Sequence, residues 1–330
     1  MNQNNTNQQN VTTPLPNKEG QGGGSSTTRW GIIYCPKQGA GRSQKRWEHI
    51  QAMLDAQKIA YDFVQSEGPE SVERLTRMLC QNGYETLIIM GGDSALNRAL
   101  NGLLSLGDET RQRVAVGVIP NGRGNDFASF WGFTEDNDEQ TINWLVQRRL
   151  RKVDVGSIRT EAGQERYFLN CVNVGLVANI MKLKYKTRRI FGLSALSYFA
   201  SMFLLLFQRL ETRMKLKINE EVIEKKLMTV CVGNARGYGQ TPNAVPYNGT
   251  LDITVVSHPE MSQLLEGLWM LFTGKFLNHK NVRAYRAPSS VRFMDIKNAT
   301  VSCDGMVLPD YTAPLRISLL PEHIDFIIPS

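Results

Sequence analysis

Short apolar runs alternate with helically spaced apolar residues through the first half of the chain. The runs have the character of buried strands: Gly31–Tyr34, Tyr61–Val64, Thr86–Met90 and Val114–Ile119. After the runs, apolar residues recur every three or four positions, as on one face of a helix; examples are Trp47, Ile50 and Leu54, then Leu96, Leu100 and Leu103. Because strands that alternate with helices build a parallel sheet, this pattern predicts an α/β domain over residues 29–155.

After Val155 the pattern changes to strand-like segments with few helical stretches between them. These segments are Tyr167–Val174, Arg213–Ile218, Leu227–Gly233, Leu251–Val256, Val291–Phe293, Ala299–Ser302, Leu315–Leu319 and Ile324–Ile328. Such a series is typical of an antiparallel β domain, here over residues 156–330. The chain of 330 residues is long enough for two domains of ordinary size.

Two further segments stand apart from this pattern. Residues 1–28 are rich in Asn, Gln, Thr, Gly and Ser, so we expect a disordered low-complexity tail, and they lack the apolar stretch of a signal peptide. Ile190–Phe207 contains no charged residue and follows a basic cluster at residues 182–189. A helix packed against the β domain is the favoured interpretation, while a helix lying on an anionic membrane surface and a short membrane span remain open.

The net charge of +7 favours an acidic partner such as a nucleotide or an anionic membrane. Nucleic acid is not expected, because the basic residues form no aromatic-interleaved groove. The five cysteines are widely spaced and odd in number, without a zinc-type spacing, which favours a reducing, cytoplasmic location. The four histidines are scattered, so a histidine metal site or a Ser-His-Asp triad has little support.

Two glycine-bearing turns carry the candidate chemistry. Met90–Ala95 and Pro120–Asp126 each end an apolar strand and precede a helical pattern. A strand that ends in glycines and opens a helix leaves backbone N–H groups free to bind phosphate. Each turn also carries an aspartate, which suggests nucleotide phosphates with a metal between them. The structural alternative is that Asp93, Ser94, Asn125 or Asp126 only caps a helix.

These turns, and five further segments in the same order along the chain, resemble the diacylglycerol kinase catalytic-domain family, which includes bacterial lipid kinases and sphingosine kinases. Residues 91–97 and 101–103 resemble GGDGTxN and NGL, and residues 119–128 resemble PxGTGNDFA. The other segments are Pro36–Gly39 for NPxSG, Ser66–Ser71 for a threonine-led segment, Tyr167–Asn170 with Gly175, Ala244–Asp252 for APxxDGxLD, and Asp304-Gly305 for DGE. The similarity extends from about Arg29 to the C-terminus.

The resemblance implies a nucleotide-binding α/β domain joined to a β-sandwich, with ATP and substrate between them and the last strands returning to the first domain. The implied reaction transfers the γ-phosphoryl group of ATP to a lipid hydroxyl with Mg²⁺, at the inner face of a membrane. It implies Asp93 and Asp304 as catalytic carboxylates, without deciding which is the base. The nucleotide-binding residues that it implies are Ser66, Gly91, Gly92, Asp93, Ser94, Asn97, Gly122, Arg123, Gly124, Asn125 and Asp126. Asp304 and Asn248 are weak metal candidates.

Several positions depart from the family pattern. Ser94-Ala95 replaces Gly-Thr, Arg123 replaces a threonine, and Cys35 replaces the asparagine of NPxSG. Asn248 replaces an aspartate and Met306 replaces the glutamate of DGE, which weakens any metal site there because hard cations prefer charged oxygen ligands. An active lipid kinase is the favoured interpretation. The alternatives are a decayed homologue that binds lipid or nucleotide without catalysis, and an NAD kinase-like enzyme. The sequence does not identify the acceptor: diacylglycerol, a sphingoid base or another long-chain alcohol would suit it equally.

Overall fold

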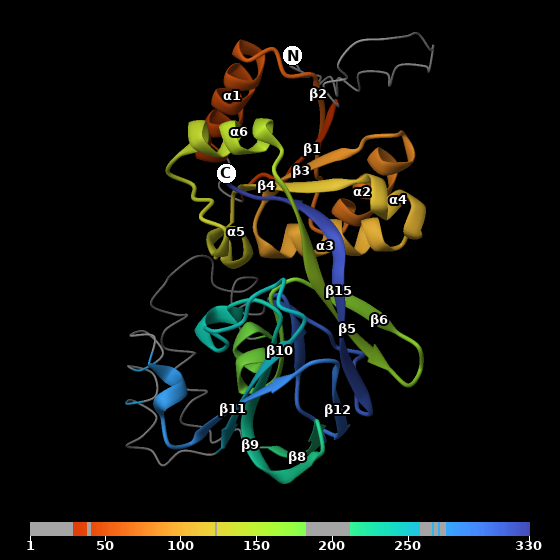
Figure 1. The fold of residues 1–330 in the computed structure, drawn as a ribbon, viewed down its shortest axis with the longest axis vertical. Coiled ribbons are helices and arrows are strands. Elements are labelled where there is room, and N and C mark those ends of the chain that lie inside the picture. The colour runs from red at the N-terminus through yellow and green to blue at the C-terminus, as the bar shows by residue number, and fades with distance from the viewer. Residues whose placement is uncertain are drawn as a thin grey trace, which may run out of the picture.

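The computed structural model describes residues 29–37, 41–122, 124–182, 212–257, 266, 270 and 275–330. In the first part of the chain the elements are β1 (Trp30–Tyr34), α1 (Gly41–Ala56), β2 (Tyr61–Gln65), α2 (Ser71–Gln81), β3 (Thr86–Gly91), α3 (Asp93–Leu104), α4 (Asp108–Arg113), β4 (Ala115–Pro120), α5 (Asp126–Phe130) and α6 (Asp138–Gln147). The first domain is thus a regular alternation of strands and helices (Figure 1).

The second part of the chain is built mainly of strands. They are β5 (Leu150–Thr160), β6 (Glu165–Phe168), β7 (Cys171–Gly175), β8 (Thr212–Ile218), β9 (Glu221–Gly233), β10 (Leu251–Ser257), β11 (Val282–Ala287), β12 (Ser290–Asp295), β13 (Val301–Cys303), β14 (Met306–Val307) and β15 (Leu315–Ile327). Short 3₁₀ turns lie at Gly237–Gly239 and Phe276–Asn278, and residues 176–182 are helical.

Helices cover both faces of the parallel sheet in the first domain, whose strand order is β4-β3-β1-β2. On one face, Leu75 and Leu79 of α2 and Leu96 and Leu100 of α3 pack on the strands. On the other face α1 and α6 pack on the strands through Trp47, Ile50, Leu54, Ile142 and Leu145. The two apolar layers keep the sheet buried on both faces, as its continuous apolar runs require.

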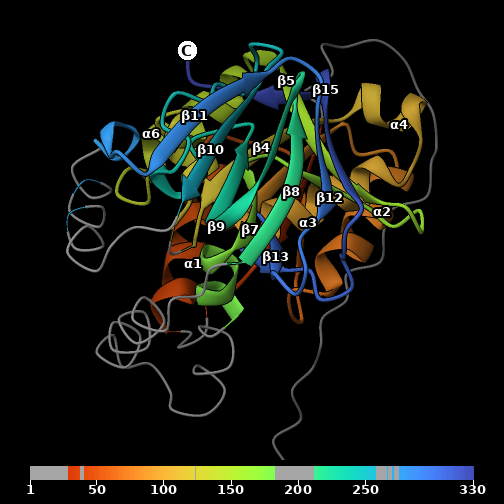
Figure 2. The ribbon, with the colours of Figure 1, turned by 90° about the horizontal axis from the view of Figure 1, so that it is seen from below.

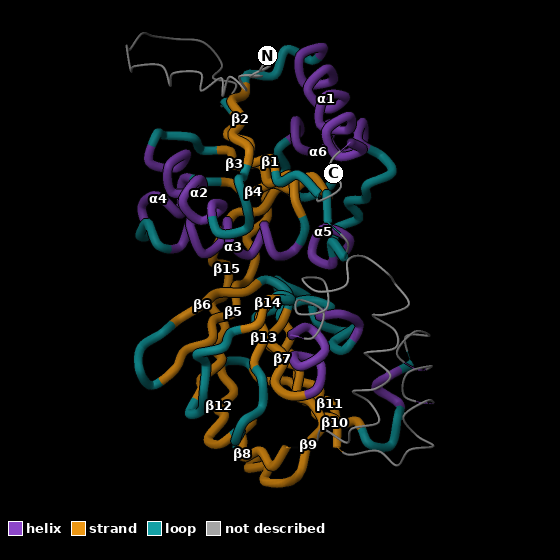
Figure 3. Tube along the Cα trace, turned by 180° about the vertical axis from the view of Figure 1, so that it is seen from behind, coloured by secondary structure: helices purple, strands orange, loops and turns teal. Residues whose placement is uncertain are grey.

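The second domain is a curved antiparallel sheet with the strand order β14-β13-β7-β9-β8-β12-β15, while β10 and β11 extend from β9 (Figures 2 and 3). Its inward residues form a separate apolar core that includes Leu216, Val230, Val291, Phe293 and Ile317. The alternation of buried and exposed residues along β8 and β12 follows the period of two of a half-solvated sheet.

A ribbon of two long strands joins the domains. β15 is antiparallel to β5 along almost all of its length, and near its end it pairs with β4 in parallel at Asp325 and Phe326. The C-terminal strand therefore belongs to both domains, so the sheets are continuous (Figure 1). This ribbon fixes how the edge of the first sheet meets the second domain.

A bulge interrupts this ribbon between Leu320 and Ile324. Asp154, buried at 1% exposure, accepts hydrogen bonds from the backbone N–H of Glu322 in the bulge (2.9 Å) and of Gly249 (2.8 Å). Asp154→Ala is expected to lower the free energy of unfolding by about 3 kcal/mol, because two backbone N–H groups lose a charged, buried acceptor. Urea denaturation followed by tryptophan fluorescence measures this change, and an unaltered midpoint would contradict it.

The predicted fold class is confirmed, and the structure refines three of the predicted strands. Tyr167–Val174 is divided into β6 and β7, because Leu169 and Asn170 turn their backbone N–H groups toward Asp304. The two predicted C-terminal strands form the single bulged strand β15. The sequence pattern missed β5 and β11, whose exposed residues are largely charged.

Two of the predictions concern residues outside those described, namely the tail at 1–28 and the segment 190–207. In the described part of the chain, none of the helices combines the length and the apolar character needed to cross a bilayer.

Candidate functional site

The strands of the first domain all end at one edge of the sheet, and the predicted site residues follow them. Ser66 comes after β2, Gly91 ends β3 and Asn121 comes after β4. Backbone hydrogen bonds hold these ends together, from Ser66 N to Tyr34 O (2.8 Å) and from Asn121 N to Gly91 O (2.9 Å). In open α/β sheets this carboxyl edge is where ligands bind.

The two glycine turns are in direct backbone contact. A Cβ atom on Gly122 would lie 2.4 Å from the Cα atom of Gly92, and one on Gly92 would lie 2.8 Å from the Cα atom of Gly122. Only glycine fits at either position, since real Cβ contacts are not this short. The sequence interpretation assigned these glycines to phosphate, and the structure adds a second reason for them: the turns pack on each other.

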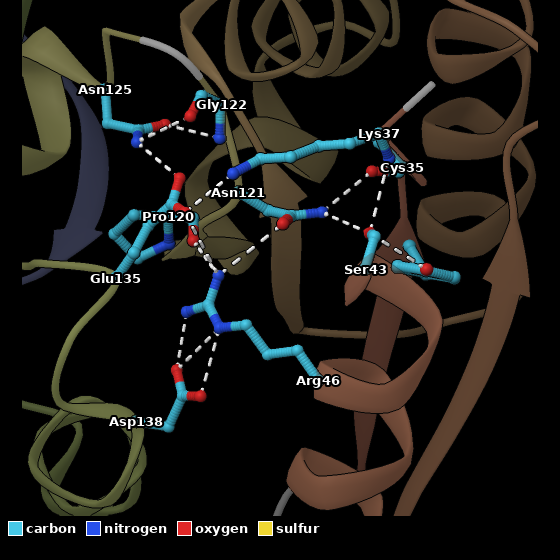
Figure 4. A network of polar contacts seen from close by, with 11 residues as sticks. Cys35, Lys37, Ser43, Arg46, Pro120, Asn121, Gly122, Asn125, Glu135 and Asp138 are labelled. Atoms are coloured by element: carbon cyan, nitrogen blue, oxygen red, sulfur yellow. Dashed lines mark hydrogen bonds and ion pairs between the residues drawn. The ribbon is translucent and has the colours of Figure 1, made fainter. Parts of the chain in front are cut away.

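The second turn is closed by Asn125, which lies in the left-handed region at φ 54°. Its Oδ1 accepts a hydrogen bond from Gly122 N (2.8 Å), and its Nδ2 donates to Glu135 Oε1 (2.9 Å). Glu135 also pairs with Lys37 (2.6 Å), so the segment after β1 is tied to the second turn (Figure 4).

A second set of polar contacts connects the turn to α1 and to the end of β1. Arg46 of α1 binds the Asp138 carboxylate and donates to the carbonyl oxygen of Pro120 (Figure 4). Asn121 donates to the carbonyl oxygen of Cys35 (3.0 Å) and to Ser43 Oγ (3.2 Å). These buried contacts fix the path of the backbone from β4 into the turn.

Asp93 joins three parts of the site through its carboxylate. Its Oδ2 accepts from Asp126 N (3.0 Å), and its Oδ1 accepts from Phe127 N (3.0 Å), which satisfies the first N–H groups of α5. Its Oδ1 also accepts from Asn170 Nδ2 of the second domain (3.1 Å). Asp93 therefore has a clear structural role, and Oδ2 keeps the only lone pair that these contacts leave open.

Asp304 comes from the second domain and is almost completely buried, at 2% exposure. It lies with Gly305 in the tight turn between β13 and β14, and both residues have positive φ (42° and 80°), as an Asp-Gly hairpin turn requires. Its Oδ1 accepts from Asn170 N and Cys171 N, and its Oδ2 accepts from Leu169 N and Asn97 Nδ2, all at 2.9 Å.

These contacts occupy all four lone-pair positions of the Asp304 carboxylate. Burial raises the pKa of Asp304 to about 6, against the opposing effect of these hydrogen bonds. The Asp304 carboxylate therefore fixes the positions of residues 169–171 and of the Asn97 side chain.

Asn97 links the two domains and is fully buried. Its Nδ2 donates to Asp304 Oδ2 and to the carbonyl oxygen of Tyr167 (2.8 Å), and its Oδ1 accepts from Asn101 Nδ2 (3.1 Å). Arg166 of β6 also donates to Asn97 Oδ1 (3.2 Å). The structure thus places Asn97 beside Asp304 as a residue that positions this carboxylate.

Asp126 differs from the other two aspartates. Among the described residues its carboxylate accepts no hydrogen bond, and it is only partly buried. Burial, followed by the negative charges of Asp93 and Asp304, raises the pKa of Asp126 to about 6. A Cβ on Gly124 would lie 3.2 Å from Oδ2 of both Asp126 and Asp93, so Gly124 keeps the space in front of the two carboxylates open.

The remaining predicted residues have separate surroundings. Ser66 is buried beside Cys35. Burial raises the pKa of the Cys35 thiol above its ordinary value, and a hydrogen bond with Ser66 offsets only part of this rise. Ser94 lies in the first turn of α3, and Arg123 lies outside the described residues. Asn248 is exposed, and its Oδ1 accepts from Thr250 N and Thr250 Oγ1 in a local turn, apart from the contacts of Asp304.

The sequence interpretation missed Asn170 as a residue of the site. Its N–H donates to Asp304, its carbonyl accepts from Asn234 N and Ala235 N, and its Nδ2 donates to Asp93. Asn170 was noted only as part of a strand motif. The signal that distinguishes it is a polar side chain at a break between two apolar strands, buried at 1% exposure.

Comparisons with known proteins identify the two domains and the family. The model of the diacylglycerol kinase catalytic domain matches residues 29–158, and that of the YegS C-terminal NAD kinase beta sandwich-like domain matches residues 170–328. A protein of Chromohalobacter salexigens named "probable lipid kinase YegS-like" is 30% identical over 66% of this chain and 69% of its own length. A diacylglycerol kinase of Mycobacterium tuberculosis is 26% identical over 75% and 78%.

Among solved structures, a diacylglycerol kinase from Bacillus anthracis superposes with a TM-score of 0.65 at 19% identity, over 92% of this chain and 97% of that one. This likeness establishes the shared fold. The matched domains and relatives define a class, the kinases built from an α/β domain and a β-sandwich. Within it, the chain belongs to the diacylglycerol kinase catalytic-domain family.

Proposed function

We propose that the protein is an ATP- and Mg²⁺-dependent lipid kinase that transfers the γ-phosphoryl group of ATP to the hydroxyl of diacylglycerol or a sphingoid base. One observation carries the proposal: three carboxylates from two domains gather beside two touching glycine turns. This arrangement suits phosphoryl transfer, which needs aligned phosphates, charge neutralisation and a carboxylate near the hydroxyl proton. The relatives' names add support, and we place the reaction at the cytoplasmic face of a membrane.

Asp126 is the carboxylate that we assign as general base. Asp304 has no free lone pair, and Asp93 is engaged with α5 and Asn170. The Asp126 carboxylate is free among the described residues, and its raised pKa of about 6 makes it a stronger base than an ordinary aspartate while it stays mostly ionised at pH 7. Accepting the hydroxyl proton requires such a group within reach of the substrate.

The carboxylate oxygen atoms of Asp93 and Asp126 are of the kind that bind Mg²⁺. In the described residues no group of three His, Cys, Asp or Glu side chains is arranged to hold a metal. Mg²⁺ commonly uses one or two carboxylates and completes its shell with phosphate oxygen atoms and water, so a full protein cage is not needed. Asp93 would hold the ion through Oδ2, beside the space kept open by Gly124. When bound, the ion neutralises negative charge on the phosphoryl group.

Gly124→Ala tests whether the space in front of the two carboxylates is used. The added methyl group would lie 3.2 Å from both Oδ2 atoms without meeting backbone, so the protein should fold while kcat/KM falls by about tenfold or more and more Mg²⁺ is needed. Gly68→Ala is the matched control, because nothing lies within 4 Å of its added Cβ. Steady-state rates at several Mg²⁺ concentrations give the comparison, and equal rates for both variants would contradict the assignment.

The direct test supplies the purified protein with labelled ATP, Mg²⁺ and a panel of lipid alcohols, and identifies the product by mass. A phosphorylated lipid supports the proposal and names the acceptor. A phosphorylated NAD in a parallel reaction would favour the NAD kinase-like alternative. Lipid binding without any product, persisting in a Met306→Glu and Asn248→Asp variant, would favour the decayed homologue.

A further inference from the structure

Four positively charged side chains form a continuous row across four adjacent strands of the second domain. Lys217 of β8 is the direct cross-strand partner of Arg292 of β12, Arg292 that of Arg316 of β15, and Arg316 that of Arg159 of β5. Directly opposed residues of antiparallel strands project from the same face of a sheet. We refer to these four residues as the cationic row; β8, β12 and β15 can be followed side by side in Figure 2.

The row lies on the solvent face of the sheet. Arg159, Arg292 and Arg316 are exposed and Lys217 is partly exposed. The residues that alternate with them, among them Ile158, Val291 and Ile317, are fully buried in the core of the second domain. The alternation fixes the orientation of the row, because a strand residue next to a buried one projects to the opposite face.

Acidic residues neutralise the ends of the row and leave its centre free. Lys217 pairs with Glu220 (3.2 Å) and Arg159 with Glu165 (3.8 Å), both at exposed positions. Arg292 and Arg316 have no acidic partner within 4.0 Å among the described residues. On the same face, the neighbouring cations Arg213 and Lys215 both pair with Glu224, and Asp295 is the cross-strand partner of Lys215.

This arrangement works against folding stability. Like charges directly opposite each other across strands destabilise a sheet. The apolar core on the other face already holds these strands together, so the fold does not require the cations. A row of opposed cations with an unpaired centre is complementary to a broad, negatively charged surface.

We propose that the cationic row binds the surface of an anionic lipid bilayer. Two exposed apolar side chains lie beside it: Val222, at 53% exposure, is the cross-strand partner of Lys217, and Met294, at 37%, follows Arg292 by two positions. Cations beside exposed apolar side chains suit the boundary between headgroups and acyl chains. The preference for a bilayer over another polyanion rests on the proposed lipid substrate, while the binding itself needs no nucleotide and no turnover.

The experiment measures co-sedimentation of the full chain with vesicles of phosphatidylcholine, with and without phosphatidylglycerol. Arg292→Gln together with Arg316→Gln should weaken binding to the anionic vesicles by about 30-fold, at about 1 kcal/mol for each basic residue. The melting temperature of this double variant should be equal to or higher than that of the wild type, because the substitutions remove repulsion between like charges. The control, Lys45→Gln together with Arg113→Gln, removes the same charge from exposed positions of the first domain and should bind within about twofold of the wild type.

Four results would overturn the proposal: no preference of the wild type for anionic vesicles, unchanged binding of the double variant, an equal loss in the control, or tighter binding of the row to a polynucleotide than to vesicles. A lipid-kinase assay in neutral detergent micelles separates this surface from the active site. The double variant should keep the micellar rate of the wild type. If the wild type has no kinase activity, the vesicle measurement still decides the role of the row.

Discussion

Asparagine in place of Asp126 is expected to lower the rate of phosphoryl transfer by about 10²- to 10⁴-fold, the usual contribution of a general base. The pKa of Asp126 is about 6 without a metal ion, and Mg²⁺ held by Asp93 would lower it. The wild-type rate should therefore fall as the pH decreases below about 6, since protonation of Asp126 removes the base. Steady-state kinetics between pH 5 and pH 9 give both results. A variant with the full rate would show that Asp126 is not the reacting carboxylate.

The same substitution is expected to stabilise the protein at neutral pH. In the folded state the pKa of Asp126 is about 6, above the ordinary value of 3.8, mainly through burial and the charges of Asp93 and Asp304. Stability gained from binding this proton is complete below pH 3.8 and is lost as the pH rises through 6. At pH 7 the ionised group is therefore unfavourable, and the asparagine variant should be more stable by about 1 kcal/mol, allowing for solvent screening.

Measurements of thermal unfolding at pH 7 and pH 4.5 distinguish this effect from a general change in packing, because the gain should become clearly smaller at the lower pH. Asp136→Asn, at an exposed position ten residues along the chain, is the matched control and should change neither the rate nor the stability. An inactive variant that is also less stable would indicate a structural role for Asp126.

Sequence motifs predicted the candidate site and two catalytic carboxylates, but they did not decide which carboxylate is the base. The glycine turns and the strands that precede them were recognised from residue type and spacing, and the Asp304-Gly305 pair from the resemblance to the family; the structure brings them together. Motif matching made Asp93 and Asp304 the catalytic pair, whereas their hydrogen bonds direct us to Asp126. The backbone donors to Asp304 lie 133 to 135 residues earlier in the chain, so no local pattern contains them.

The strands that the sequence missed have a common physical cause. β5 begins with Leu-Arg-Lys at exposed positions and β11 alternates apolar residues with arginines at the edge of a sheet, so neither shows a continuous apolar run. β15 was predicted as two strands because Pro321, Glu322 and His323 interrupt its apolar pattern. The Asp154 carboxylate accepts a hydrogen bond from the backbone N–H of Glu322 in this bulge, and the two residues are 168 positions apart in the chain.

Asparagine in place of Asp304 is expected to lower the free energy of unfolding by about 3–5 kcal/mol, since buried charged groups are costly to disturb when their partners remain. The carboxylate accepts two hydrogen bonds on each oxygen, from the backbone of residues 169–171 and from Asn97. An amide at this position turns its NH₂ group toward two of these donors, whichever way it is oriented. Three of the four donors belong to the second domain, and the fourth, Asn97, belongs to α3 of the first domain.

Urea denaturation of the Asp304→Asn variant measures this loss, with Asp310→Asn at an exposed position of the following loop as the control that should leave the midpoint unchanged. Kinase rates are compared at a temperature where both variants are folded. A stable but inactive Asp304→Asn protein would make Asp304 the reacting carboxylate and Asp126 a secondary group. A destabilised variant that keeps a residual rate while folded would show that Asp304 acts by holding residues 169–171 of the second domain against Asn97 of the first domain, since its four hydrogen bonds leave no lone pair for substrate.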